Sequence, residues 1–329
     1  MLVLSFRDMS VPRCAAVTSA AVYRLGAVTA ASVWAPPPRY EWAPWPEVTQ
    51  AWAGKHVCFV VHGFNVDRDR GYTGFGAAAQ EMAPGGALAA LAGPPGPLNL
   101  FTPGVDVAVP VLWAGDWYLP INYPFLLPDI RLTGKYFAQL IASAATRMAR
   151  VSFVTHSMGA RVVLETVQQT VAAMGPRAPV FDTAVFTAAA TSDDVLDDPG
   201  YALAVEAIRR FVVVSSRADT VLSGAFPAGN LVEQWLWPRD PGADEALGRY
   251  GPRLKVGSKA LSKTEWYPIP PITGQNHGDY FPEPWSPSAP YPNGWSVKRV
   301  NIGQLDQAVL DNQAPPTLLA RPITPVSGN

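Results

Sequence analysis

The amino-acid sequence predicts an α/β protein built on a doubly wound, mostly parallel sheet. Short apolar stretches with strand character alternate along its 329 residues with longer stretches that suit helices, and this alternation favours parallel pairing. The apolar stretches in the middle of the chain are hydrophobic almost throughout, which is typical of strands that helices cover on both faces. No internal repeat is visible. We therefore expect a single domain over residues 1–329, with insertions.

Each expected strand is a short run rich in β-branched or aromatic residues that ends in turn-forming residues. In chain order these runs lie near residues 2–7, 30–34, 57–61, 106–112, 151–154, 182–188 and 211–215. Helices are expected in the longer runs of helix-forming residues. Those runs lie near residues 73–82, 131–149, 159–173, 200–208 and 302–312.

Two segments do not fit this alternation. Residues 113–130 are dense in aromatic residues and prolines, and residues 226–271 form a second long connection that contains several tryptophans. Connections of this length are usually functional or have structure of their own. We expect both to be insertions that form a substrate wall or a cap, the alternative being that they pack on the sheet as scaffold.

The composition argues against several classes of function. The net charge is −1 and no basic stripe is present, so there is no electrostatic basis for binding nucleic acid or an anionic membrane. The longest apolar runs fall well short of the roughly 18 residues of a spanning helix. No secretory signal is evident, although residues 15–31 are rich in small residues, and we expect a soluble, cytoplasmic protein. Cys14 and Cys58 make no disulfide framework and no zinc spacing, so neither a metal nor a cofactor is expected.

Residues 151–163 read V-S-F-V-T-H-S-M-G-A-R-V-V and have the form of a nucleophile elbow. The run before Ser157 suits a short buried strand and the run after it suits a helix, so Ser157 falls on the turn between them. Such a turn holds a serine hydroxyl toward a base and beside the amide donors of a helix N-terminus. Gly159 lets strand and helix approach closely, and His156 is expected to pack or hydrogen-bond beneath the turn. A serine that only caps the helix is the alternative.

A second apolar run ends in His62-Gly63-Phe64-Asn65. A tetrahedral oxyanion needs two donors, normally the amide after the nucleophile and an amide from a loop after an earlier strand. Here these are expected to be the amides of Met158 and Phe64. Gly63 lets the main chain pass close to a substrate carbonyl, where a Cβ would obstruct it. We expect His62 to brace this loop rather than to act as a base.

At these motifs the chain resembles the α/β-hydrolase superfamily, and in particular a lipase- and esterase-like bacterial branch of mostly unassigned function. The resemblance covers most of residues 55–280. It rests on H-G-F-N at 62–65, T-H-S-M-G-A-R at 155–161, S-S-R-A-D at 215–219 and N-H-G-D-Y at 276–280. It implies a mostly parallel sheet with helices on both faces and a triad in the chain order serine, acid, histidine. Thr155 departs from the G-x-S-x-G pattern, which concerns the packing of the elbow rather than the nucleophile.

The base and the acid are expected in the second half of the chain. Of the four histidines, two lie on or beside the oxyanion strand and one lies in the elbow, which leaves His277 as the base. Asp219 follows an apolar run, and catalytic groups of open α/β sheets gather at the carboxyl ends of strands. Asp193 or Asp194, which follow an earlier strand, are the alternative acid, unless they cap the next helix.

Together these residues predict a serine hydrolase that cleaves a carboxylic ester through an acyl-enzyme. An acyltransferase would use the same triad, and a binding protein on a degenerate hydrolase scaffold is the alternative from another class. Aromatic residues of the first insertion are expected to contact an apolar acyl or aryl group. These substrate-binding residues are Trp113, Trp117, Tyr123 and Phe125.

Overall fold

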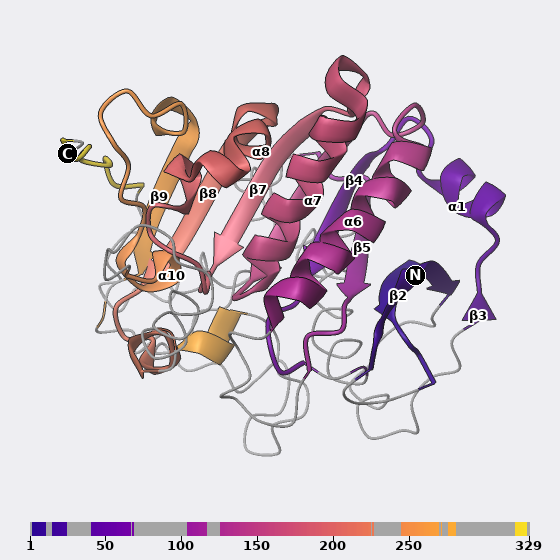
Figure 1. Cartoon of the computed structure of the whole chain (residues 1–329), viewed down its shortest axis with the longest axis horizontal. Coiled ribbons are helices and arrows are strands. Elements are labelled where there is room, and N and C mark those ends of the chain that lie inside the picture. Colours follow the sequence, from indigo (N-terminus) through magenta and orange to yellow (C-terminus); the bar gives the residue numbers. More distant parts are fainter. Residues whose placement is uncertain are drawn as a thin grey trace, which may run out of the picture.

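The computed structural model of this protein describes residues 2–10, 15–24, 41–66, 68, 104–116, 126–224, 226, 245–269, 271, 276–280 and 320–327. Within these residues the chain forms a nine-stranded sheet (Figure 1). Its strands are β1 Leu2–Arg7, β2 Val17–Arg24, β3 Glu41–Trp42, β4 His56–Val61, β5 Val107–Leu112, β6 Arg150–His156, β7 Phe181–Thr187, β8 Ile208–Ser216 and β9 Thr264–Ile269.

The strands lie in the order β3-β2-β1-β5-β4-β6-β7-β8-β9. The β1–β2 and β2–β3 pairs are antiparallel, and the pairs from β1–β5 through to β8–β9 are parallel. The predicted mostly parallel sheet of an α/β protein is therefore confirmed. Because β5 lies on one side of β4 and β6 on the other, the direction of the chain across the sheet reverses at β4. Open α/β sheets bind their ligands at the carboxyl ends of strands beside such a reversal.

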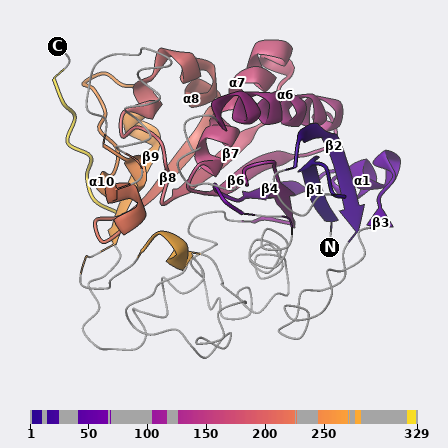
Figure 2. The ribbon, with the colours of Figure 1, turned by 60° about the horizontal axis from the view of Figure 1, so that its bottom comes forward.

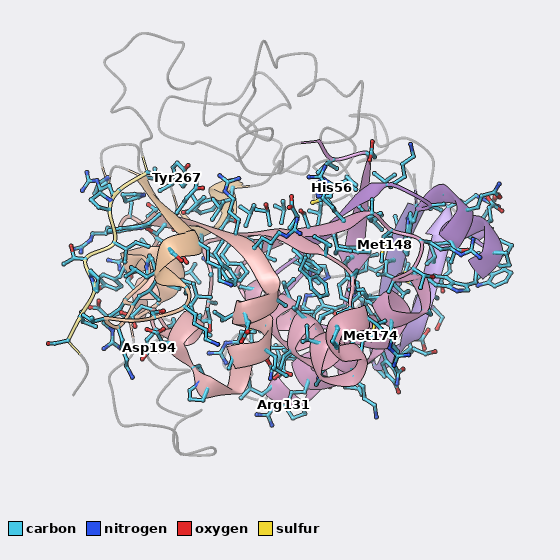
Figure 3. The ribbon with its side chains drawn as sticks, turned by 90° about the horizontal axis from the view of Figure 1, so that it is seen from above. His56, Arg131, Met148, Met174, Asp194 and Tyr267 are labelled. Atoms are coloured by element: carbon cyan, nitrogen blue, oxygen red, sulfur yellow. The ribbon has the colours of Figure 1, made fainter. Side chains whose placement is uncertain are left out.

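Helices follow the central strands. They are α1 Trp45–Ala51, α6 Leu127–Ala144, α7 Gly159–Met174, α8 Ala202–Ala207 and α10 Leu247–Tyr250. Helix α6 packs along α7, and α7 packs against α8. Seen from above in Figure 3, Arg131 of α6 and Met174 of α7 lie on the same side of the sheet. Helix α1 lies at the end of the sheet that carries β3, as Figures 1 and 2 both show.

An aromatic cluster fixes α6 to the middle of the sheet. Phe137 of α6 meets Phe59 of β4 edge to face, with ring centroids 5.0 Å apart, and meets Phe153 of β6 at 6.1 Å. All three side chains are fully buried. Edge-to-face contacts of buried rings favour one packing geometry. This packing fixes the position of α6 over β4 and β6, which are themselves paired in parallel with Phe59 opposite Phe153.

Six of the seven expected strands are confirmed, as β1, β4, β5, β6, β7 and β8. The helices expected near 159–173 and 200–208 correspond to α7 and to α8 with the short 3₁₀ turn Pro199–Tyr201 before it. The strand expected near 30–34 and the helices expected near 73–82 and 302–312 lie outside the described residues.

Strand β3 and helices α1 and α10 were not expected, and three further elements differ from the expectation. Strand β2 is only partly buried and includes small and polar residues, so it lacks the continuous apolar run that marks the central strands. Strand β9 contains Pro268, which is tolerated there because β9 is an edge strand. Helix α6 begins at Leu127 because Pro128 is compatible with a first turn, and it ends at Ala144 rather than at 149. Residues 264–269 and 127–130 therefore belong to regular elements and not to the expected insertions.

No helix among the described residues has the length and apolar character needed to cross a membrane.

Candidate active site

Ser157 lies on a sharp turn between β6 and α7. Its φ is +53°, in the left-handed region that costs a residue with a Cβ roughly 1 kcal/mol or more. Its amide donates to the Thr187 carbonyl at the end of β7, at 3.0 Å. A Cβ on Gly159 would come within 2.6 Å of the Val61 carbonyl oxygen, so only glycine fits where the elbow crosses the end of β4. The strand, turn and helix expected from the sequence are therefore present, with Ser157 at the turn.

The threonine that stands in place of the usual glycine is accommodated by the neighbouring strand. Thr155 is fully buried, and its hydroxyl donates to the Val185 carbonyl at 3.0 Å. Its own carbonyl accepts from the Thr187 hydroxyl at 2.7 Å. Two threonine hydroxyls therefore add cross-strand bonds between β6 and β7, and both of these buried hydroxyls have an acceptor.

Ser157, His277 and Asp219 form a continuous chain of hydrogen bonds. His277 Nε2 lies 3.0 Å from Ser157 Oγ, and His277 Nδ1 lies 2.8 Å from Asp219 Oδ2. Because an ionised carboxylate only accepts, the ring proton sits on Nδ1, and Nε2 is left to accept from the serine hydroxyl. Asp219 and Ser157 are buried, whereas the His277 side chain keeps 16% of its surface exposed. His277 begins the short 3₁₀ helix η9, His277–Tyr280, which lies below the carboxyl ends of the strands in Figure 1.

The two candidate acids lie in different surroundings. Asp219 Oδ1 accepts from the Leu222 amide at 2.9 Å, so both oxygens of this carboxylate are engaged. Asp193 instead pairs with Arg253, with 3.1 Å between Oδ2 and Nε, and Asp194 pairs with the same guanidinium at 3.3 Å. Asp194 lacks a capping bond to the helix that follows it. Asp219 thus contacts His277, whereas Asp193 and Asp194 form ion pairs with Arg253.

The loop after β4 passes directly over Ser157. A Cβ on Gly63 would lie 2.6 Å from the Ser157 Cβ, so the close approach depends on glycine. Asn65 has a φ of +58°, and its amide donates to the Gly115 carbonyl at 2.8 Å. Phe64 follows Gly63 and Met158 follows Ser157, so both expected oxyanion amides lie within one residue of this contact. The Met158 amide is also at the start of α7, where helix amides point out of the helix.

His62 braces this loop, as expected, and its partner is Trp113. The Trp113 amide donates to His62 Nε2 at 3.1 Å, which places the ring proton on Nδ1, facing the Gly63 carbonyl at 2.8 Å. The indole N–H of Trp113 donates to the His62 carbonyl at 2.8 Å, and the two rings stack 5.7 Å apart. Both residues are fully buried. His62 is thus held neutral as a structural element of the loop.

The substrate-binding residues expected from the sequence fall into two groups. Trp113 is fully buried and hydrogen-bonded to His62, so its position suits support of the loop rather than contact with a substrate. Asp116, three residues after Trp113, forms a buried ion pair with Arg7 at 3.0 Å. Trp117, Tyr123 and Phe125 lie outside the described residues.

His156 lies beneath the turn, as expected. Its Nε2 is 2.7 Å from the His277 carbonyl oxygen, and the two imidazole centroids are 4.8 Å apart. Because a carbonyl only accepts, Nε2 carries the proton. Burial, reinforced by the nearby His277 ring, lowers the pKa of His156 to about 3. The ring is therefore neutral near pH 7.

Two residues near this chain of hydrogen bonds had no role assigned from the sequence. Arg249 of α10 donates to the main-chain carbonyl of Asp219, a long-range contact without a local sequence signal. Asn276 lies in the quoted N-H-G-D-Y stretch, and its side-chain oxygen accepts from the amides of both Thr220 and His277. The position of Asn276, a polar residue directly before His277 in this short motif, was the signal from which a role could have been predicted.

Comparisons with protein-family models and with curated proteins find no match to this chain. Among the described residues, no group of three or more histidine, cysteine, aspartate or glutamate side chains is arranged to hold a metal ion.

Proposed function

We propose that this protein is a serine hydrolase with an α/β-hydrolase fold, which cleaves a carboxylic ester through an acyl-enzyme. The observation that carries the proposal is the position of His277, whose two ring nitrogens face Ser157 Oγ at 3.0 Å and Asp219 Oδ2 at 2.8 Å. A base between a hydroxyl and a buried carboxylate is the arrangement that makes serine nucleophilic.

The proposed reaction assigns a role to each group. Ser157 Oγ attacks the ester carbonyl carbon while His277 Nε2 takes the hydroxyl proton, and Asp219 stabilises the imidazolium that results. The amides of Phe64 and Met158 donate to the oxyanion. His277 then gives its proton to the leaving alkoxide. In the second half, His277 takes a proton from water as the water attacks the acyl carbon, and the imidazolium then returns this proton to Ser157 Oγ as the acid leaves.

The geometry argues against a purely structural serine. A serine that caps a helix accepts from amides in the first turn. Helix α7 has Met158 at its N-cap position and no side-chain capping bond. The Ser157 side chain is instead paired with His277, and its left-handed backbone would be an unexplained cost without a function for the turn.

Ester turnover by Ser157→Ala tests the proposal. The change is small, so the variant is expected to fold and to lose on the order of 10³-fold or more of p-nitrophenyl ester hydrolysis. Ser143→Ala, in α6, is a matched control that removes a hydroxyl bonded only to the Leu140 carbonyl. Folded Ser157→Ala with activity within about tenfold of wild type would overturn the assignment. Preferential transfer of the acyl group to an added alcohol would identify an acyltransferase instead.

A further inference from the structure

Both polar main-chain groups of His277 are held by side chains. Its amide donates to Asn276 Oδ1 at 2.8 Å, and its carbonyl accepts from His156 Nε2 at 2.7 Å. The donor and the acceptor of each bond are unambiguous, since a main-chain amide can only donate and a carbonyl can only accept. The backbone that carries the base therefore has one bond toward the segment of the acid and one toward the elbow.

Asn276 connects the segment of the acid to that of the base. Its side-chain oxygen also accepts from the Thr220 amide at 3.0 Å and from the Thr220 hydroxyl at 3.1 Å. Thr220 directly follows Asp219, and Asn276 directly precedes His277. The Asn276 side-chain oxygen thus forms a second link between the two segments that the bond of 2.8 Å between Asp219 and His277 already joins.

His156 connects the elbow to the base in the same way. His156 directly precedes Ser157. Its bond to the His277 carbonyl is therefore a second link between the elbow and His277, in addition to the contact of 3.0 Å between His277 Nε2 and Ser157 Oγ. The titratable side chains near it include His277 and His62, which both lower its pKa, and Tyr280, whose ring centroid is 6.3 Å away. The neutral ring keeps its Nε2 proton as a donor to the His277 carbonyl near pH 7.

We propose that His156 and Asn276 are positioning residues, which fix the His277 backbone so that its ring meets Ser157 and Asp219 together. The inference rests on the proposed serine hydrolase function and extends it to two residues that do not touch the reacting atoms. Since a displacement of about 1 Å in a reactive group can cost on the order of 10²-fold in rate, a second bond across each contact has a direct kinetic consequence.

Paired variants separate positioning from simple stabilisation. Asn276→Ala removes the shared acceptor, whereas Asn276→Asp keeps an oxygen in the same place. His156→Leu removes the donor, whereas His156→Gln places an amide nitrogen at the same number of bonds from the backbone. His56→Leu is the control: His56 is also buried and hydrogen-bonded, to Ser152 and Gly104, but at the amino end of β4.

The assay is the rate of covalent labelling of the full-length protein by a fluorophosphonate, measured against pH, with thermal unfolding recorded in parallel. Asn276→Ala and His156→Leu should label about 10- to 100-fold more slowly than wild type at a temperature where each is folded. His156→Gln should recover to within about threefold, and His56→Leu should label at the wild-type rate. Asn276→Asp should keep its labelling at high pH, but its added negative charge should move the acid limb of the profile to higher pH.

The outcomes are distinguishable. If the wild-type protein is not labelled, or if Ser157→Ala is labelled as fast as the wild type, both the proposed function and this inference are contradicted. Ser157-dependent labelling that is unchanged in Asn276→Ala and His156→Leu would overturn the positioning role alone. If either of these variants fails to fold, the Asn276→Asp profile and His156→Gln rate still decide, because a profile without a shift or a Gln variant without recovery contradicts the role.

Discussion

Asp219→Asn is expected to inactivate the protein by moving a proton rather than by changing its shape. In the wild type, one carboxylate oxygen accepts from the Leu222 amide at 2.9 Å and the other from His277 Nδ1 at 2.8 Å. The Leu222 amide can only donate, so the new side chain keeps its oxygen there and turns its NH₂ group toward Nδ1. Nδ1 must then accept, and the ring proton moves to Nε2.

A proton on Nε2 prevents the imidazole from accepting the proton of Ser157. The expected loss in turnover is on the order of 10⁴-fold, which corresponds to about 5 kcal/mol of transition-state stabilisation. Hydrolysis of p-nitrophenyl esters gives the turnover, and slow fluorophosphonate labelling should persist because Ser157 and the proposed oxyanion amides are intact.

Asp193→Asn is the matched control for this change. It breaks a partly exposed ion pair with Arg253, so it should lower the melting temperature while leaving turnover per folded molecule within about tenfold of wild type. Near-wild-type turnover in Asp219→Asn, together with severe loss in Asp193→Asn or Asp194→Asn, would refute the reasoning and place the acid after β7.

Three further results are expected. Because burial lowers the pKa of His156 from 6.5 to about 3, the unfolded chain takes up this proton first, so stability is complete above pH 6.5 and falls toward pH 3. The free energy of unfolding in urea should fall by about 2 to 3 kcal/mol between pH 6.5 and pH 4.5 because of this group. His156→Gln should show a flatter dependence of this free energy on pH, and equal pH dependence in the two proteins would contradict the expectation. Asp116→Asn should cost about 3 to 5 kcal/mol in urea unfolding because it leaves the buried Arg7 charge without its partner, and a loss below about 1 kcal/mol would show that the pair is unimportant. If the first insertion contacts an apolar acyl group, two added acyl carbons should raise kcat/KM by roughly tenfold, and a flat profile with unchanged kinetics in Trp117→Ala and Phe125→Ala would remove that role.

The elbow turn and the selection of His277 as the candidate beside Ser157 could be predicted because both depend on local or countable features. An apolar run that changes abruptly to helix-forming residues around Ser157 encodes the elbow. The chain has only four histidines, and His277 was the one that remained as a candidate base after the other three were placed on or beside a strand or in the turn. The central strands were predictable for a similar reason, since burial on both faces requires apolar residues throughout.

The remaining features depend on contacts between distant segments. Asp219 and Asp193 both follow β-strands, and only the packing of Arg253 against one and His277 against the other separates them. Trp113 has the aromatic character of a ligand-binding residue, but its amide and indole N–H groups are both used by His62. Strands β2 and β9 were missed for different reasons: β2 is only partly buried and lacks a continuous apolar run, and β9 is an edge strand that tolerates Pro268.

Peptide mass spectrometry after treatment of the intact protein with a fluorophosphonate tests the role of Ser157 most directly. The expected result is a single adduct on the peptide that contains Ser157, absent in Ser157→Ala and formed far more slowly in His277→Ala. Folded wild-type protein that hydrolyses esters but carries its adduct on another serine, or that reacts equally fast in His277→Ala, would contradict the proposed site.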